Sequence, residues 1–308
     1  MSLSSGFLTD KKVVFTLSLL SCLLWGSAFP AVKAGYAIFN ISAGDTASQI
    51  LFAGYRFFLA GLLLVLFCLA GKRKIFSLDG QDVIRAGSLG FLMTTMQYIF
   101  FYIGVANVSG VKGSIITGVG TFFAVGLAHL FFKNEALTRR TIYGCLIGFA
   151  GVISVNFSDS LDLSFRLGAE GMLVIAAFLH ALGGVYGKII SRVMDTVVMT
   201  ALQLTIGGFI LILLGFVLGG SISGFTPKSI ALLAYLSLIS STAFAVTATL
   251  LKHNPVSMVT VFQFSIPVFG AVLSAFVLNE SLLDWKNLVA LVCVCCGIYL
   301  VTQGKRTK

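Results

Sequence analysis

Ten apolar stretches separated by short polar connectors are the feature that most limits how this 308-residue chain can fold. An α-helix needs about 20 predominantly apolar residues to cross the hydrocarbon core of a bilayer. The stretches cover residues 13–34, 50–70, 86–105, 114–132, 142–157, 171–190, 199–219, 229–251, 259–278 and 287–302. The sequence therefore predicts an all-α integral membrane protein with ten transmembrane helices.

The composition agrees with a lipid environment. Hydrophobic residues make up 57% of the chain and charged residues 10%, whereas roughly 25% of a soluble domain is charged. The 33 glycines and four prolines suit long helices that pack closely through small residues. The first stretch is too long for a signal-peptide core and lacks a small-residue cleavage site, so we expect it to be a helix of the mature protein.

The formal net charge of +10 could indicate a nucleic-acid surface or a membrane topology, and the positions of the basic residues favour topology. Fifteen fall on the predicted side of the termini: Lys11, Lys12, Lys72, Arg73, Lys74, Arg85, Lys133, Arg139, Arg140, Lys188, Arg192, Lys252, Lys305, Arg306 and Lys308. Five fall on the other side: Lys33, Lys112, Arg166, Lys228 and Lys286. Because basic residues are enriched in cytoplasmic loops, we expect both termini in the cytoplasm, a plasma or inner membrane location, and no nucleic-acid partner.

One sequence plan occurs twice. Residues 131–151 and 276–297 each run from the end of an apolar helix through an Asn-Glu pair and a charged joint to a second apolar helix with a late glycine. An offset of 145 aligns the two pairs, and an offset of 155 places His180 on Trp25. Repetition over such a distance indicates a duplicated structural unit.

The repeat divides the chain into two five-helix units, residues 1–157 and 158–308. Because five is an odd number, the second unit enters the membrane in the opposite orientation. An inverted duplication of this kind predicts a binding site at mid-membrane between the halves. Glu135 and Glu280 then lie on opposite faces of the membrane and cannot form a catalytic pair. We interpret them as helix-end residues, with Thr138 and Asp284 as caps for the helices that follow.

The predicted depth in the membrane makes residues of the first two helices candidates for a functional site. Trp25 lies about midway along the first stretch, too deep for the interfacial aromatic belt, and Pro30 can loosen the hydrogen-bond ladder beside it. This combination favours a cavity wall with a kinked helix, and packing against a neighbouring helix is the alternative. Arg56 lies about two turns from the outer end of the second helix, where a charge is a functional hypothesis by default. We interpret it as a gating or helix-locking residue rather than a direct substrate ligand.

Three further helices carry aromatic and hydroxyl candidates. Tyr98 and Tyr102 share one face of the third helix at i and i+4. Thr117 precedes Gly118 in the fourth helix, where interhelical hydrogen bonding is the alternative to ligand binding. Phe244 follows a run of serines in the eighth helix. These positions predict a site of aromatic rings with hydrogen-bonding tips.

The sixth and ninth helices add His180 and Gln263. Gln263 stands one turn before Pro267, a predicted kink where freed carbonyls could face a ligand. His180 is predicted near mid-membrane, and its intrinsic pKa suits proton handling; the alternative is a neutral His bonded across helices. The absence of Asp and Glu deep in any predicted helix disfavours a carboxylate-based proton or sodium site. Proton coupling, exchange and facilitated diffusion all stay open.

The sequence offers no catalytic constellation. The six cysteines lie in predicted helices without zinc-finger spacing or neighbouring histidines, and we interpret them as packing residues. No nucleophile with a base, carboxylate pair or set of metal ligands occurs at one depth. We therefore expect no enzyme, cofactor or metal site; an intramembrane lipid-modifying enzyme and a sensor or scaffold are the remote alternatives.

Several motifs in a fixed order resemble a known family. They are WGSAFPAVK at 25–33, YRFFLAGLLL at 55–64, NEAL at 134–137, GCLIGFAGV at 144–152 and SIPVFGAVLSAFVLNESL at 265–282. In this order, over essentially its whole length, the chain resembles an EamA-type member of the drug/metabolite transporter superfamily. The resemblance implies alternating access to a cavity lined by helices one, three, four, six, eight and nine, with five and ten behind as supports. On that lining it places Trp25, Tyr98, Tyr102, Thr117, His180, Phe244 and Gln263.

The expected lining also bears on the substrate. Aromatic rings with neutral polar groups and a His suit a small amphipathic metabolite, such as an amino acid, better than a phosphate, which would require a central Lys or Arg. Another solute class (nucleoside, amine, sugar or organic anion) is the alternative. Family analogy alone favours export, and the sequence does not predict an oligomeric state.

If His180 handles a proton during transport, we expect His180→Ala to abolish or alter the pH dependence of uptake into vesicles, because no other side chain at that depth titrates near neutrality. Flux of wild type and variant is measured across a pH series. Unchanged flux at every pH would contradict this role.

Overall fold

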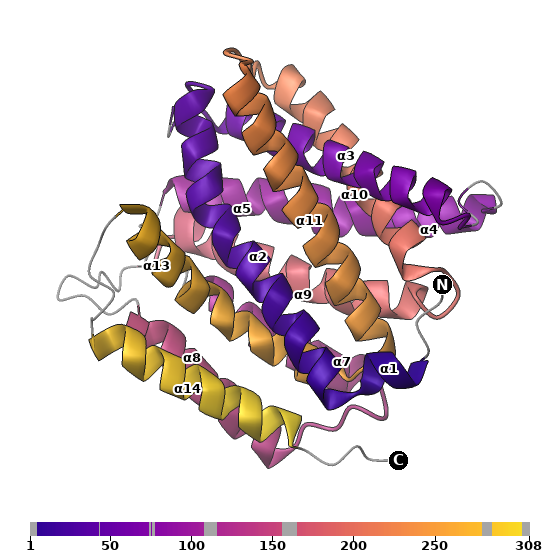
Figure 1. Ribbon diagram of the computed structural model, residues 1–308, viewed down its shortest axis with the longest axis vertical. Helices are drawn as coiled ribbons and strands as arrows, with labels where there is room; N and C mark the ends of the chain where they lie inside the picture. The colour runs from indigo at the N-terminus through magenta and orange to yellow at the C-terminus, as the bar shows by residue number, and fades with distance from the viewer. Residues whose placement is uncertain are drawn as a thin grey trace.

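The computed structural model describes residues 5–42, 44–73, 75, 78–107, 116–155, 165–278 and 285–303 (Figure 1). All regular secondary structure in these residues is helical. The helices are α1 (Ser5–Thr9), α2 (Lys11–Ile38), α3 (Thr46–Ala70), α4 (Gly80–Gly90), α5 (Gln97–Ala106), α7 (Gly120–Phe131), α8 (Arg139–Val155), α9 (Met172–Ile190), α10 (Thr196–Val217), α11 (Pro227–His253), α12 (Val256–Thr260), α13 (Ser265–Leu278) and α14 (Trp285–Thr302). Each of the ten predicted stretches coincides wholly or partly with helix.

Three helical segments contain irregular turns that the sequence did not predict. The π-helical turn Phe91–Met96 joins α4 to α5, the π-helical turn Leu167–Gly171 precedes α9, and the 3-10 turn Val261–Phe264 joins α12 to α13. Five segments are long and apolar enough to cross a membrane: α2, α3, Leu167–Ile190, α10 and α11. The remaining apolar helices are shorter.

Side chains placed just before the helices explain where several of them start. Asp10, Asp45 and Asp195 each accept hydrogen bonds from backbone N–H groups in the first turn of α2, α3 and α10. Thr226 and Ser229 form a reciprocal capping box at α11. Such caps satisfy N–H groups that have no partner within the helix. Asp45 starts α3 at Thr46, four residues earlier than predicted.

Six of the helices form two bundles. In the first bundle α2 packs against α11 and α13, and in the second α9 packs against α5 and α7 (Figure 1). A Cβ atom on Gly26 of α2 would lie 2.8 Å from Phe269 Cβ of α13, and one on Gly104 of α5 would lie 2.6 Å from Leu173 Cγ of α9. Glycine therefore allows close approach in both bundles.

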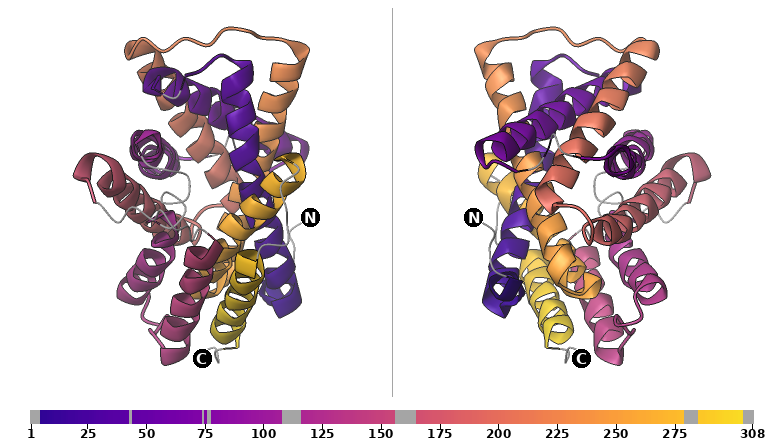
Figure 2. Two further views of the ribbon diagram at one scale, coloured as in Figure 1. Left: turned by 90° about the vertical axis from the view of Figure 1, so that its left-hand side faces the viewer. Right: turned by 90° about the vertical axis from the view of Figure 1, so that its right-hand side faces the viewer.

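The remaining long helices pair closely, α3 with α10 and α8 with α14 (Figure 2). A Cβ atom on Gly61 of α3 would lie 2.4 Å from Thr205 N, and one on Gly208 of α10 would lie 2.3 Å from Phe58 N. In the second pair, a Cβ atom on Gly297 would lie 2.6 Å from Gly144 O. Backbone meets backbone in both pairs, so larger residues cannot occupy these positions without displacing a helix.

These contacts repeat between the halves of the sequence. The α3–α10 pair joins the second helix of the first half to the second helix of the second half. The α8–α14 pair joins the fifth helices of the two halves in the same way. The two bundles are related in the same way, because α2, α11 and α13 are the first, eighth and ninth predicted helices, and α9, α5 and α7 are the sixth, third and fourth. Exchanging the halves therefore leaves the two helix pairs unchanged and converts one bundle into the other.

Contacts between distant segments bring both ends of the described chain to one end of the molecule, which we call the N-terminal end. Asn254 Nδ2 donates to Leu8 O at 2.9 Å, and Arg140 Nη1 lies 3.5 Å from Gln303 O. Glu135, just before α8, bonds to the first residue of α12. The start of α2, the end of α14 and the α7–α8 connection thus lie together.

The outer faces of the helices are apolar. Exposed side chains include Leu66, Phe67, Phe209, Phe216 and Leu238. In a soluble protein apolar surface of this extent marks an interaction site, and around a helical bundle of this composition it fits contact with lipid. Cys22, Cys68 and Cys145 are buried and free, as packing residues would be, whereas Cys293 is half-buried and Cys295 and Cys296 are exposed.

Because α3 and α10 are in close contact, we expect that adding a single methyl group between them strongly lowers the stability of the protein. We expect Gly208→Ala to lower stability by about 1–3 kcal/mol or more, because the added Cβ atom meets the backbone of α3. The matched control is Gly126→Ala in α7, where a Cβ atom meets nothing within 4 Å and helix propensity gains up to about 1 kcal/mol. Thermal unfolding of the purified variants measures both. Equal stability of the two variants would contradict the close contact.

Candidate functional site

Four helices contribute aromatic rings to one cluster between the two bundles. Trp25 of α2 meets Phe244 of α11 edge to face, with ring centroids 4.9 Å apart. Phe57 of α3 lies 4.4 Å from Tyr98 of α5 and 6.1 Å from Phe244. Tyr102 continues the cluster at 6.2 Å from Tyr98. Trp25 and Phe244 belong to the first bundle, and Tyr98 and Tyr102 to the second.

Arg56 lies inside this aromatic cluster. Its side chain is buried, with the residue 3% exposed, and its Nε atom donates to Ser240 Oγ of α11 at 2.8 Å. The guanidinium carbon lies 5.0 Å from the Phe57 ring centroid and 5.9 Å from that of Trp25. Its Nη2 atom is buried with no hydrogen-bond partner among the described residues. The cluster therefore encloses a cation that still has donor capacity.

The structure changes the position of Arg56 within its helix. Because α3 begins at Thr46 rather than at residue 50, Arg56 lies ten residues inside the helix, or about 15 Å along its axis. Arg56 is therefore near the middle of α3 rather than close to its start.

Tyr36 adds a further polar group. It belongs to α2, and its ring packs with Phe52 of α3 at 5.7 Å. Its buried hydroxyl has no hydrogen-bond partner among the described residues, and it lies near Tyr102 and Arg56. Sequence reasoning missed Tyr36, Phe57 and the Ser240 contact, because it could judge depth but not which helix faces meet.

His180 and Gln263 lie elsewhere. His180 is half-buried in α9, between Ala177, which lies against Gly120, and Gly184, which lies near Leu251. Gln263 is half-buried in the 3-10 turn between α12 and α13. No hydrogen bond or ion pair among the described residues joins either side chain to the aromatic cluster, so their roles stay predictions.

Thr117 lies in the short helical stretch that precedes α7. It is half-buried, and its neighbour Gly118 lies against Phe149 of α8. The structure therefore places Thr117 next to a supporting helix as well as in the second bundle, and its role also stays a prediction.

The two prolines have different surroundings. α2 runs as one helix through Pro30. Pro267 is the third residue of α13, a position where a missing N–H removes little intrahelical bonding. In the irregular turn before it, Phe262 O accepts a hydrogen bond from Cys22 Sγ at 3.1 Å. That carbonyl is thus bonded to α2, and the proposed role of carbonyls freed by Pro267 stays a prediction.

A buried ion pair links the bundles at the N-terminal end. Glu135 Oε1 pairs with Lys188 Nζ, and the two side chains are 9% and 11% exposed. Lys188 Nζ also donates to Asn254 O at 2.6 Å, and Val256 N donates to Glu135 Oε2 at 2.6 Å. We call these three contacts the Glu135 bridge. It joins α7 and α9 of the second bundle to the α11–α12 connection of the first.

The Glu135 bridge gives Glu135 a larger role than the sequence suggested. The sequence predicted a helix-end residue, and Thr138 does cap α8 by accepting from Thr141 N at 3.2 Å. Asp284 lies outside the described residues. The burial of Glu135 was not predicted. The available signal was that Glu135 and Lys188 were both placed at the same end of the bundle, each beside apolar residues.

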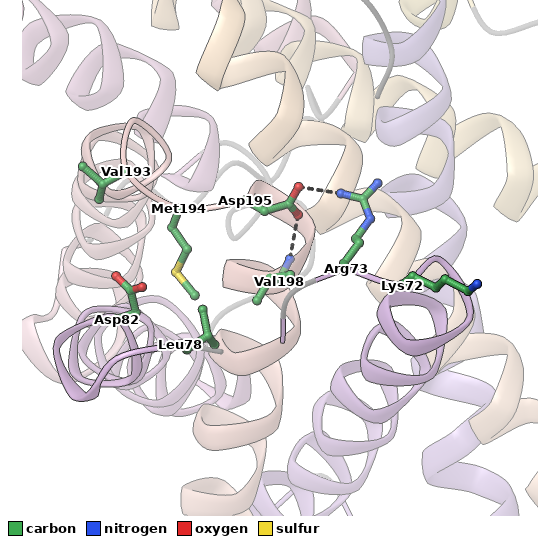
Figure 3. A pocket seen from close by; sticks show the side chains of 8 residues that line it. All are labelled: Lys72, Arg73, Leu78, Asp82, Val193, Met194, Asp195 and Val198. Atoms are coloured by element: carbon green, nitrogen blue, oxygen red, sulfur yellow. Dashed lines mark hydrogen bonds and ion pairs between the residues drawn. The ribbon is translucent and has the colours of Figure 1, made fainter. Parts of the chain in front are cut away.

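A pocket of about 410 Å³ lies away from the aromatic cluster (Figure 3). It lies at the N-terminal end between the end of α3, the start of α4 and the α9–α10 connection. Arg73 Nη1 pairs with Asp195 Oδ2 at 2.6 Å across it, and both side chains are partly exposed. Asp195 is also the cap of α10, which explains its position structurally. Within the described part of the chain, no group of three His, Cys, Asp or Glu residues could hold a metal ion.

Comparison with known proteins identifies the family. The sequence profile of the EamA-like transporter family matches twice, over residues 12–157 and 168–303. The chain belongs to the EamA-like transporter family. Membership makes it a multi-pass membrane transporter of a small molecule and not an enzyme.

Relatives of this EamA-like transporter share most of its length. An uncharacterized transporter of Archaeoglobus fulgidus is 26% identical, covering 92% of this chain and 95% of its own. The uncharacterized transporter YvbV of Bacillus subtilis is 28% identical, covering 93% and 90%. The uncharacterized inner membrane transporter YedA of Escherichia coli is 25% identical, covering 92% and 88%.

A solved structure resembles the EamA-like transporter in fold. One chain in a crystal structure superimposes with a TM-score of 0.77 and 14% sequence identity, covering 95% of this chain and 97% of the other. At this identity the likeness concerns the fold alone. It agrees with the arrangement of helices around the aromatic cluster.

Because the Glu135 bridge is buried, we expect that removing one charge of its ion pair strongly lowers the stability of the protein. We expect Glu135→Gln to destabilise the EamA-like transporter by about 3–5 kcal/mol, because Lys188 then stays buried without a counter-charge. Thermal unfolding measures the effect, and Glu135→Gln with Lys188→Met should recover part of it. The control is Arg73→Gln, which breaks an exposed pair worth about 0–1 kcal/mol. Similar shifts for Glu135→Gln and Arg73→Gln would contradict the buried assignment.

Proposed function

We propose that this EamA-like transporter moves a small amphipathic metabolite, such as an amino acid, between its two bundles by alternating access. The observation that carries the proposal is the aromatic cluster around Arg56, to which both bundles contribute. A substrate held there would meet rings for stacking and tyrosine hydroxyls for hydrogen bonding. Movement of one bundle against the other would then open the cluster to either end.

The proposed topology is ten transmembrane helices in two inverted halves, residues 1–157 and 158–308, with both termini in the cytoplasm. Its support is threefold. The family profile matches once in each half, and exchanging the halves preserves the two helix pairs and converts one bundle into the other. Basic residues are also more numerous on the side of the termini. The N-terminal end of the molecule is then the cytoplasmic end, and the membrane is the plasma or inner membrane.

The Glu135 bridge fits a closed cytoplasmic gate. It joins the bundles where the cytoplasmic path would open, and in the centre the rings of Trp25, Phe244 and Tyr98 pack around Arg56. Transport would require the bridge to break when the cytoplasmic side opens, at the cost of separating a buried ion pair. Water entering the open gate would solvate both charges and offset part of that cost.

Direction and coupling belong to the proposal as well. Export is favoured by analogy alone. Coupling to protons through His180, exchange of one solute for another, and facilitated diffusion are the three possible mechanisms. A carrier of another solute class, such as an organic anion, is the second candidate, and the buried cation in the centre favours it over a nucleoside, amine or sugar carrier.

Transport by the purified protein tests the proposal. A thermal-shift screen of amino acids, organic acids, nucleosides, sugars and amines finds a ligand by its stabilisation of the folded state, and proteoliposomes containing only this protein measure its flux. We expect saturable flux in wild type and a loss of about tenfold or more in Trp25→Ala and Phe244→Ala, because each removes a stacking surface.

The matched control for these variants is Phe216→Ala, which removes an exposed ring on α10 and is expected to leave flux unchanged. Absence of flux for every ligand that binds, or equal flux in wild type and both cluster variants, would contradict transport through this site.

A further inference from the structure

We propose that Arg56 binds the carboxylate of a monoanionic substrate whose apolar or aromatic body stacks on the rings of Trp25, Phe244 and Tyr98. This assignment rests on the proposed transport function and names the chemical class of its substrate. It replaces a gating role for Arg56 with direct contact.

The first argument is charge. Arg56 is buried near the middle of α3, a helix long and apolar enough to cross a membrane, and an ionised group inside such a helix is costly unless it is paired or faces water. The ion pairs among the described residues involve Arg73, Arg85, Arg166 and Lys188, and none of them includes Arg56. The groups in contact with its guanidinium are neutral. They are the Ser240 hydroxyl, which accepts a hydrogen bond, and the rings of Trp25 and Phe57, which supply cation–π attraction. The positive charge is therefore uncompensated until an anion arrives.

The second argument is hydrogen-bonding capacity. Ser240 occupies the Nε atom of Arg56, and the Ser240 hydroxyl donates in turn to Leu236 O at 2.7 Å. This chain holds the guanidinium in place. The Nη2 atom has no partner among the described residues although it is buried. A positioned donor of this kind matches a carboxylate oxygen, and charge-assisted bonds of this type are among the strongest in proteins.

The third argument distinguishes a monoanion from a dianion. One guanidinium neutralises one negative charge, and the cluster contains no second basic side chain among the residues in contact with Arg56. A phosphate monoester would bring nearly two charges and keep one of them uncompensated inside the membrane. The rings of Trp25 and Phe244 pack edge to face, 4.9 Å apart, and would offer an apolar surface to the rest of the substrate once the bundles separate. A substrate with one carboxylate and an apolar body matches both the single charge of Arg56 and the aromatic rings.

Binding of matched probes tests the assignment. The probes are acetate, isovalerate, phenylacetate, alanine, leucine and phenylalanine, each with its amide, and phenyl phosphate as a dianion. Trp25 and Trp285 are the two tryptophans of the chain, so Trp285→Phe makes Trp25 the sole indole. Its fluorescence then reports ligands beside Arg56, 5.9 Å from its ring.

In wild type and in Trp285→Phe we expect at least one carboxylate to bind about ten- to a hundredfold more tightly than its amide, and phenyl phosphate to bind no better than phenylacetate. Arg56→Gln is expected to reduce the preference for the carboxylate over its amide to below about threefold. Arg56→Lys keeps the charge and is expected to keep part of the preference. The control Lys33→Gln, at an exposed position on α2, is expected to keep all of it.

The assignment is wrong if no probe binds wild type, if an amide binds as well as its carboxylate, or if Arg56→Gln keeps the preference. The comparison within wild type decides the matter even if Arg56→Gln fails to fold. Flux separates this assignment from the proposed function. Carboxylate binding without flux would contradict transport alone, and flux that ignores the carboxylate would contradict the role of Arg56 alone.

Discussion

The close contact between α3 and α10 is the constraint on which the rest of the structure depends. Glycines on both helices bring backbone against backbone, from Gly215 beside Leu51 to Gly61 beside Thr205. Because α3 comes from the first half of the chain and α10 from the second, this contact ties the halves together. It also fixes Arg56 in the middle of the molecule, since Gly54, two residues earlier, lies against the backbone of α10.

Two bundles of mixed origin flank this fixed pair, and each contributes to both the centre and the N-terminal end. The aromatic cluster joins α2 and α11 of the first bundle to α5 of the second, and the Glu135 bridge joins α7 and α9 to the start of α12. The central contacts are mainly apolar rings, whereas the contact at the end is a buried ion pair. A ligand competes with the former, and water competes with the latter.

Much of this arrangement could be predicted because length and depth are properties of a sequence. Apolar length gave the helices, and position along each helix placed Trp25, Tyr98 and Phe244 at compatible depths. Which neighbouring helix a side chain faces is harder to read from a sequence. His180 has a comparable predicted depth, yet it lies between α7 and α11 because Ala177 and Gly184 set the rotation of α9. The burial of Glu135, the position of Arg56 within α3 and the irregular turns likewise depend on caps and packing that apolar length does not reveal.

The most direct test of alternating access is a pair of distance measurements between spin labels on the two bundles. One pair, at Lys12 and Lys133, spans the N-terminal end, and the other, at Lys33 and Leu167, spans the opposite end; all four positions are exposed. The account predicts two populations in which one distance lengthens as the other shortens, with Glu135→Gln enriching the state that is open at the N-terminal end. Two distances that stay constant, or that lengthen together, would contradict it.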